Sequence, residues 1–266
     1  MSNIRFTAKM SGDAEVMRLL SRFPQKIGRT LESLVKQEAR GMAVELSRYT
    51  RPLGFADKAK QQGMKSVSAD IRKVFALPGA AYEEIQQTDP KSAGRFWADV
   101  TNRRFARARK TLSRATSSWS GMTIGRLDPM LHKQSRNDRG RVKRKKPAMI
   151  VTTGKALDTY IAKIQRRVGF AKGAWINAAK AIGGRVRNSA QWVTRHKQSP
   201  GTARVKTGTR PSVTLITNLS YMRDVCPETF IDRALEFASS RLRKALATSL
   251  RIVAQRENDR LNRRAG

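Results

Sequence analysis

The chain has 266 residues and a formal net charge of +35, from 55 Lys and Arg against 20 Asp and Glu. Such an excess repels itself in free solution, so we expect an anionic partner, either nucleic acid or an acidic protein. The single cysteine, Cys226, excludes an intramolecular disulfide and a Cys-rich zinc site. We find no signal-peptide pattern and no run of ~18 apolar residues, so we expect no membrane segment and a place in the cytoplasm or in a particle assembled there.

The N-terminal part has the clearest helical pattern. Apolar residues recur at spacings of three, four and seven, which predicts an amphipathic helix over residues 13–51. Pro52 predicts that this helix ends near Thr50. A second apolar stripe predicts a helix over residues 56–75, whereas residues 79–100 are ambiguous between short helices and irregular chain.

The middle of the chain is strongly basic. Residues 101–146 contain 15 Lys and Arg against two Asp, an excess of 13 positive charges. The second half of this segment has little hydrophobic periodicity. We therefore predict a long basic loop or arm here.

The C-terminal part alternates between helical and extended patterns, with turn residues between them. The element predicted best as a strand is Ser212–Leu219, because apolar and polar residues alternate there. The other predictions are a short strand over 148–152, a helix over 155–182 ended by Gly183-Gly184, a polar loop over 197–210, a helix from Pro227 to about Val253 or beyond, and a fraying basic tail over 258–266.

The residues that usually carry catalysis are few and scattered. His132 and His196, the only histidines, fall in or near basic loops and are predicted to lie on the surface. Cys226 directly precedes a proline that suits a helix start, and we expect it to be a packed structural residue. The carboxylates are too dispersed to hold a pair of metal ions. We therefore predict no enzyme, no metal site and no cofactor.

The basic clusters are the remaining candidates for a site. One interpretation is that they form a patch that contacts nucleic-acid phosphates, in which case each neutralised phosphate steepens the log–log salt dependence of binding by about one unit. The other interpretation is that they are solvated segments that an acidic protein covers. No sequence-reading module is present, so contact with nucleic acid is expected to be non-specific and to the backbone. The predicted contact residues are Arg103, Arg104, Arg107, Arg109, Arg141, Lys143, Arg144, Lys145 and Lys146.

The order of the predicted elements carries a resemblance. A long N-terminal helix ends in the turn Arg51-Pro52-Leu53-Gly54, a long insertion follows, and a strand then leads through Asn218-x-x-Tyr221 into a closing helix. This order resembles the tailed-bacteriophage tail-completion and neck (head–tail connector) family, which includes lambda's basic minor tail protein Z.

The resemblance implies an α+β fold in which the N-terminal and C-terminal helices pack on a small β-sheet, with a basic, partly irregular helical insertion. The expected parts are residues 1–78, the insertion 79–210 and residues 211–266. Family members form rings, commonly hexameric, at the head–tail junction or the top of the tail. The implied partners are further copies of the chain, other neck, tail or connector proteins, and double-stranded genomic DNA.

We therefore expect a structural virion protein of a tailed phage, assembled in the host cytoplasm. The alternatives are a free-standing non-specific nucleic-acid-binding or packaging protein, and a minor capsid protein. A DNA-binding protein of that kind would retard short duplexes alone, with an affinity that collapses as salt rises. A neck protein would need its neighbours to oligomerise.

Overall fold

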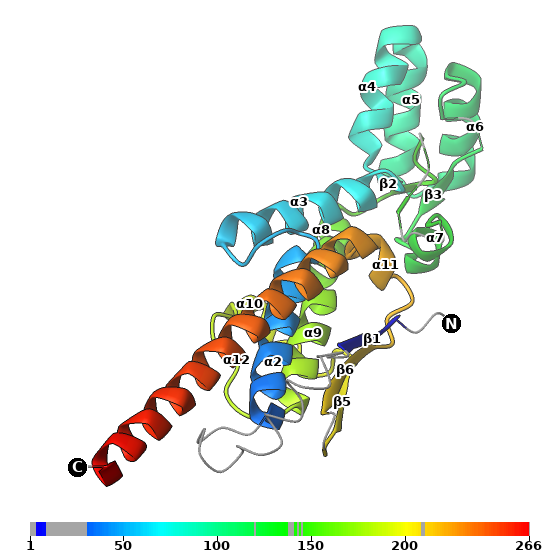
Figure 1. The fold of residues 1–266 in the computed structure, drawn as a ribbon. Coiled ribbons are helices and arrows are strands. Elements are labelled where there is room, and N and C mark those ends of the chain that lie inside the picture. Colours follow the sequence, from blue (N-terminus) through cyan, green and yellow to red (C-terminus); the bar gives the residue numbers. More distant parts are fainter. Residues whose placement is uncertain are drawn as a thin grey trace. The chain divides into compact units, whose positions relative to one another are not determined.

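The described residues of the computed structural model are 4–8, 31–119, 121–137, 141–142, 144, 146–208 and 211–265. Within them the chain is a mostly helical α+β protein (Figure 1). It forms two compact units. The first unit joins Met1–Lys60 to Gly169–Gly266, and the second is Gln61–Val168. The second unit is thus an insertion in the chain of the first, with boundaries that differ from those expected after residues 78 and 210.

Among the described residues of the first unit, helix α2 packs against both α9 and α12, and two short helices accompany them. Of the helix predicted over residues 13–51, residues 13–30 lie outside the described part. The described helix ends at Tyr49, which agrees with the predicted end near Thr50. At this end the amide and hydroxyl of Thr50 both donate to the Leu46 carbonyl, at 2.9 and 2.7 Å. The helices are α2 (Leu31–Tyr49), α9 (Phe170–Ala181), α10 (Gln191–Thr194), α11 (Met222–Val225) and α12 (Glu228–Ala265).

A three-stranded antiparallel sheet completes the first unit, in the order β1-β6-β5. Strand β6 (Ser212–Thr217) confirms the strand predicted over 212–219. It pairs on one side with β1 (Ile4–Ala8) and on the other with β5 (Gly201–Lys206). Strand β5 corrects the prediction of a polar loop over 197–210. Its polar residues occupy the exposed positions of an edge strand, so the segment reads as a loop from composition alone.

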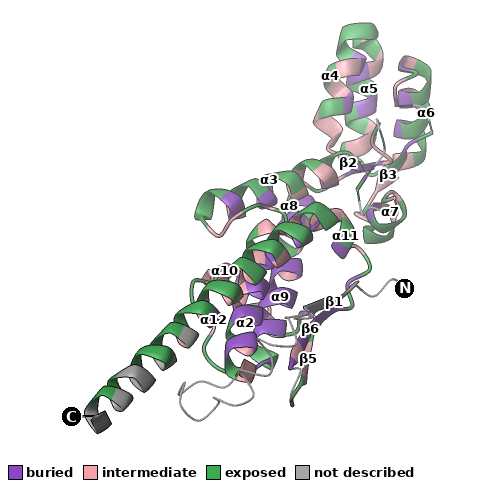
Figure 2. Cartoon of the chain, viewed as in Figure 1, coloured by how far each residue is buried: buried purple, intermediate pink, exposed green. Residues whose placement is uncertain are grey.

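The core of the first unit lies where α2, α9 and the sheet meet, and Figure 2 shows α2 and α9 buried along much of their length. Small residues on α9, including Ala174 and Ala178, allow the neighbouring backbones to approach closely. At Gly201 of β5 a Cβ atom would come within 1.7 Å of the Ala174 carbonyl oxygen, so only glycine fits. Fully buried Leu46 contributes about 1.5–3 kcal/mol of hydrophobic stabilisation.

Helix α12 packs on α2 through its N-terminal half, where Ile231, Ala234 and Leu246 are buried. The helix continues to Ala265, so the tail predicted to fray is helical. Pro227 directly precedes the first residue of α12, in agreement with the helix start predicted there. None of the described helices is both long enough and apolar enough to cross a membrane.

The second unit contains six helices and a small parallel sheet in the order β2-β4-β3 among its described residues. The central strand β4 confirms the short strand predicted over 148–152. The ambiguous segment 79–100 forms two helices. The elements are α3 (Asp57–Arg72), which begins in the first unit, β2 (Phe75–Ala76), α4 (Pro78–Thr88), α5 (Pro90–Thr101), α6 (Phe105–Ala115), β3 (Thr123–Gly125), α7 (Pro129–Gln134), β4 (Met149–Val151) and α8 (Gly154–Gln165).

Two apolar clusters stabilise the second unit. In the first, helices α4, α5 and α6 form a three-helix group around Ile85, Phe96 and Leu112, all fully buried. In the second, α3 and α8 pack with the sheet around Phe75 and Leu157. The prediction that α3 extends to Phe75 is wrong, because the helix ends at Arg72 and Phe75 enters strand β2.

The single helix predicted over residues 155–182 is two helices, α8 and α9, which belong to different units. The chain breaks at Gly169, whose φ of +92° lies in the left-handed region. A Cβ there would approach the Trp192 ring to 2.7 Å. The apolar stripe continues across the break at nearly helical spacing, so periodicity alone predicts one helix.

The loop predicted over residues 101–146 contains regular secondary structure in its described part, namely α6, β3 and α7. Helix α6 has a narrow buried stripe, Ala108 and Leu112, at a spacing of four, flanked by half-buried Phe105. Because the fully buried part of this helix face is only two residues long, the stripe is too sparse to stand out in the sequence. The correction places Arg107 and Arg109 of the first predicted basic cluster on a regular helix.

Candidate anion-contact site

The first predicted basic cluster lies at one end of the three-helix group. Arg103 and Arg104 form the turn between α5 and α6, and Arg107 and Arg109 lie on α6. All four side chains are exposed. Arg104 is the N-cap residue of α6 and provides no side-chain hydrogen bond to the helix, and the first helical turn has no acidic residue.

Helix α6 has distinct inner and outer faces. Ala108 and Leu112 point into the three-helix core, whereas Arg107, Lys110 and Arg114 share an exposed stripe at spacings of three and four. The sequence-based contact set omitted Lys110 and Arg114. The helical spacing of these two residues from Arg107 places them on the same face, and this spacing applies only because residues 105–115 form a helix.

The second predicted cluster is partly described. Arg141, Arg144 and Lys146 are exposed. Lys143 and Lys145 lie outside the described residues. The backbone amide of Arg141 donates to the Asn137 side chain at 2.9 Å, and Arg144 Nε donates to the Lys146 carbonyl at 3.2 Å. Both clusters belong to the second unit.

Two acidic residues of the three-helix group, Glu84 and Asp89, bond within the group. Glu84 Oε2 accepts a hydrogen bond from Trp119 Nε1 at 2.5 Å. Asp89 is the N-cap of α5 and accepts from the backbone amide of Ser92 at 3.2 Å and from its hydroxyl. These bonds from Ser92 lower the pKa of the Asp89 carboxyl. Among the described residues, no carboxylate forms an ion pair with a cation of α6.

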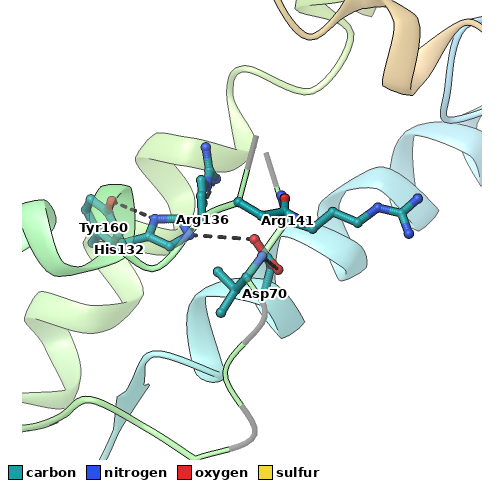
Figure 3. A network of polar contacts seen from close by, with 7 residues as sticks. Asp70, His132, Arg136, Arg141 and Tyr160 are labelled. Carbon is teal, nitrogen blue, oxygen red and sulfur yellow. Dashed lines mark hydrogen bonds and ion pairs between the residues drawn. The ribbon is translucent and has the colours of Figure 1, made fainter. Parts of the chain in front are cut away.

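A second polar feature is a network centred on the buried side chain of His132 (Figure 3). His132 is 2% exposed, which corrects the prediction of a surface histidine. Its Nδ1 lies 2.9 Å from the Tyr160 hydroxyl, and its Nε2 lies 3.4 Å from the Arg136 guanidinium. Because Arg136 can only donate, we assign Nε2 as the acceptor and Nδ1–H as the donor to the Tyr160 oxygen.

Asp70 connects the His132 network to the basic segment. Its Oδ2 lies 3.7 Å from His132 Nε2, and its Oδ1 accepts from the Val142 amide at 3.1 Å. Burial and Arg136 lower the pKa of His132, and Asp70 opposes this shift. Helices α3, α7 and α8 are thereby joined through polar side chains. A general base must reach its substrate, so an enclosed histidine of this kind fits a structural role.

The first unit contains a buried cation, Lys172 of α9, that the sequence analysis did not single out. The side chain is fully buried, and Nζ donates to the Ser47 carbonyl at 2.7 Å and to the Arg48 carbonyl at 3.3 Å, at the C-terminal end of α2. Nζ also lies over the rings of Phe55 and Trp192, at 5.3 and 5.8 Å. The negative end of a helix and two ring faces both favour a cation.

Burial lowers the pKa of Lys172 to about 7, and Cys226 opposes the shift. Cys226 is fully buried, which confirms that it is a packed residue. Burial raises the pKa of its thiol, opposed by Thr50 and Lys172. His196, predicted to lie on the surface, is half-buried and meets Phe170 edge-on at 5.8 Å between ring centroids.

A surface depression of about 450 Å³ lies along α8. Its lining has neither a carboxylate nor an imidazole, and the Tyr160 hydroxyl within it already contacts His132. The described residues include no group of three or more His, Cys, Asp or Glu that could hold a metal ion. The exposed cations of α6 have no ion-pair partner among the described residues.

Comparison of the chain with protein-family models, with curated proteins and with solved structures finds no match in any of the three. Functional inference therefore rests on the residues, the fold and the charge distribution.

Proposed function

We propose that the chain is a structural virion protein of a tailed phage, located at the head–tail junction or at the top of the tail. In this role it forms a homo-oligomeric ring and contacts acidic neighbouring proteins, genomic DNA or both. The observation that carries the proposal is the outer face of α6, an ordered helix whose cations have no described acidic partner. A regular helix whose positive charges are not neutralised by acidic residues of the described chain suits a surface that a polyanion covers.

The chain order of the elements supports the same proposal. The first unit places α2, β6 and α12 together, with the second unit inserted after α2. This is the order of long helix, insertion, strand and closing helix on which the resemblance to the tail-completion and neck family rests. Assembly into a ring would concentrate the charge of several copies, and anionic partners would then stabilise the ring.

The experiment is deletion of the gene from the phage that encodes it, with electron microscopy of the resulting lysate. The proposal predicts DNA-filled heads and tails that fail to join, or tails of aberrant length, and restoration of infectious particles by the gene supplied from a plasmid. Normal particles that lack only this chain would contradict it.

A second candidate, a free-standing non-specific nucleic-acid-binding or packaging protein, draws on the same exposed cations. The two candidates differ in where the protein is found. A virion component co-purifies with intact particles at a fixed copy number after washing at high salt. A free-standing binding protein dissociates under that wash, because its phosphate contacts weaken steeply with salt.

A further inference from the structure

We propose that the outer face of α6 binds the sugar–phosphate backbone of double-stranded DNA, and that an acidic protein is not its partner. This inference rests on the proposed function, which left the anion open, and it assigns one anion to one surface. The surface consists of the cations that lead into α6 and those on its exposed side: Arg103, Arg104, Arg107, Lys110 and Arg114.

The first argument is the composition of the outer face. The other exposed positions of α6 are Ala106, Arg109 and Ser113, so the face has no large apolar side chain. Protein interfaces derive most of their affinity from buried aromatic or aliphatic anchors. Phosphate contact needs only positive charge and hydrogen-bond donors. A face of cations and small residues therefore fits a nucleic-acid backbone better than a protein.

A contrasting surface in the same three-helix group strengthens this argument. On α5, Trp97 is 48% exposed and meets Tyr82 of α4 edge-on, at 5.4 Å between ring centroids. Exposed aromatic side chains of this kind are the usual anchors of protein interfaces. The three-helix group thus has an aromatic pair whose exposed tryptophan suits a protein partner, whereas the outer face of α6 has no exposed aromatic side chain.

The second argument is spacing. Arg107, Lys110 and Arg114 follow one another along a stripe about 10 Å long, at 1.5 Å per residue. Duplex DNA carries one phosphate charge per about 1.7 Å of its axis, so a stretch of that length presents about six charges. The three cations of the stripe can therefore contact about half of those charges, and the two arginines of the preceding turn extend the surface, without requiring any particular base sequence.

The third argument is availability. Glu84 and Asp89, in the same three-helix group, are engaged by Trp119 and Ser92. No described carboxylate forms an ion pair with the α6 cations. No intramolecular ion pair among the described residues therefore has to break before these side chains meet a phosphate. Five of the six cations between residues 103 and 114 are arginine, whose planar fork can contact phosphate oxygens in pairs.

The test measures binding of the full-length chain to a labelled 30-base-pair duplex by fluorescence anisotropy across a salt series. The test variant is Arg107→Gln/Lys110→Gln/Arg114→Gln, since glutamine removes charge and retains helix propensity. The matched control, Arg233→Gln/Arg243→Gln/Lys244→Gln, removes three exposed cations from α12. Both variants have the same net charge, so a general charge effect would appear equally in both.

We expect micromolar, sequence-independent binding by the parent chain. The α6 variant should lose about 2.7 units of log–log salt slope and at least about tenfold in affinity at low salt, and the α12 control should lose less than one unit. Equal losses in the two variants, or no loss in the α6 variant, would overturn the inference. If the triple variant misfolds by circular dichroism, single replacements of Arg107 and Lys110 should each lower the slope by about 0.9.

A second probe, poly-glutamate, separates the two anions. If the α6 variant lost poly-glutamate binding and kept duplex binding, the face would be a protein contact and the inference would be wrong. The gene-deletion experiment decides the proposed function separately. Joined heads and tails in the absence of the gene would refute the virion role, whereas an unchanged salt slope would refute only the DNA contact at α6.

Discussion

Three cations of α2 and α12 in the first unit have surroundings different from those of the cations of α6 in the second. In the first unit Lys36 pairs with Glu32 at 2.5 Å, Arg48 with Glu45 at 3.1 Å, and Arg241 with Glu38 at 2.9 Å. Arg40 donates to the Gly183 carbonyl. On α6 no cation has a described acidic partner. The contrast teaches that a net charge of +35 combines cations that hold the fold together with cations that remain available to a partner.

The comparison is sharpest between Lys172 and the α6 stripe. Lys172 is enclosed by carbonyl oxygens, two aromatic rings and Cys226, whereas the α6 cations are exposed. Replacing Lys172 should therefore affect folding, and replacing the α6 cations should affect binding. The predictions that follow run from the largest expected effect to the smallest.

Lys172→Ala should lower the free energy of unfolding by about 4 kcal/mol. The replacement leaves a cavity and strips the Ser47 and Arg48 carbonyls of a donor. Urea denaturation measures the effect. The control is Lys180→Ala on the same helix, an exposed lysine whose loss should change stability by less than about 0.5 kcal/mol. Equal effects at the two positions would show that burial of Lys172 is not important for the fold.

His132→Ala should cost about 3 kcal/mol, since it removes a buried ring and the partner of the Tyr160 hydroxyl. Its neighbour Lys133, which is exposed, supplies the control, Lys133→Ala, with an expected change below about 0.5 kcal/mol. The pKa of His132 is lowered, so the unfolded chain binds more protons just below pH 6.5. Stability of the parent chain should therefore fall on acidification through that range, and the variant should lack this component.

The pKa of Lys172, lowered to about 7, predicts a rise in stability with pH. Between pH 7 and the ordinary lysine pKa, the unfolded chain binds more protons than the folded chain, so stability increases as pH rises. From pH 7 to 8, below the ordinary range of the Cys226 thiol, the gain is about 1 kcal/mol. Denaturation of the parent chain and of Lys172→Met at both pH values measures it. The same rise in both proteins would rule out Lys172 as its source.

The smallest effect concerns the exposed cations themselves. The α6 triple variant should change the free energy of unfolding by less than about 0.5 kcal/mol, because no described interaction is lost. Arg241→Gln, which breaks the half-exposed ion pair with Glu38, should cost up to about 1 kcal/mol. Thermal melts of both variants test the order. A larger loss from α6 would mean that its cations stabilise the fold.

Much of the first unit could be predicted from the sequence. The pattern ending near Thr50, the alternation in β6 and the proline before α12 each express a strong local preference that the fold retains. The break at Gly169 could not be predicted, because it depends on the distant Trp192 ring. Strand β5 was missed because an edge strand with a polar face resembles a loop.

The candidate site was predictable in part. The density of arginine between residues 103 and 109 pointed to a contact surface, and that segment is exposed. The stripe that Arg107 forms with Lys110 and Arg114 could not be predicted, because the segment was expected to be a loop and the stripe exists only on a helix. The burial of His132 and Lys172 could not be read from the sequence, because their partners, Tyr160 and the carbonyls of α2, lie 28 and about 125 residues away.

The most direct test is a cryo-electron microscopy reconstruction of the intact particle with this chain located in it. The account predicts a ring of copies at the head–tail junction or the top of the tail, with the outer face of α6 against DNA density. A particle that lacks the chain, or a chain placed elsewhere in the shell, would contradict the virion role. A ring at that position with α6 against an acidic protein would leave the role intact and contradict the assignment of the anion.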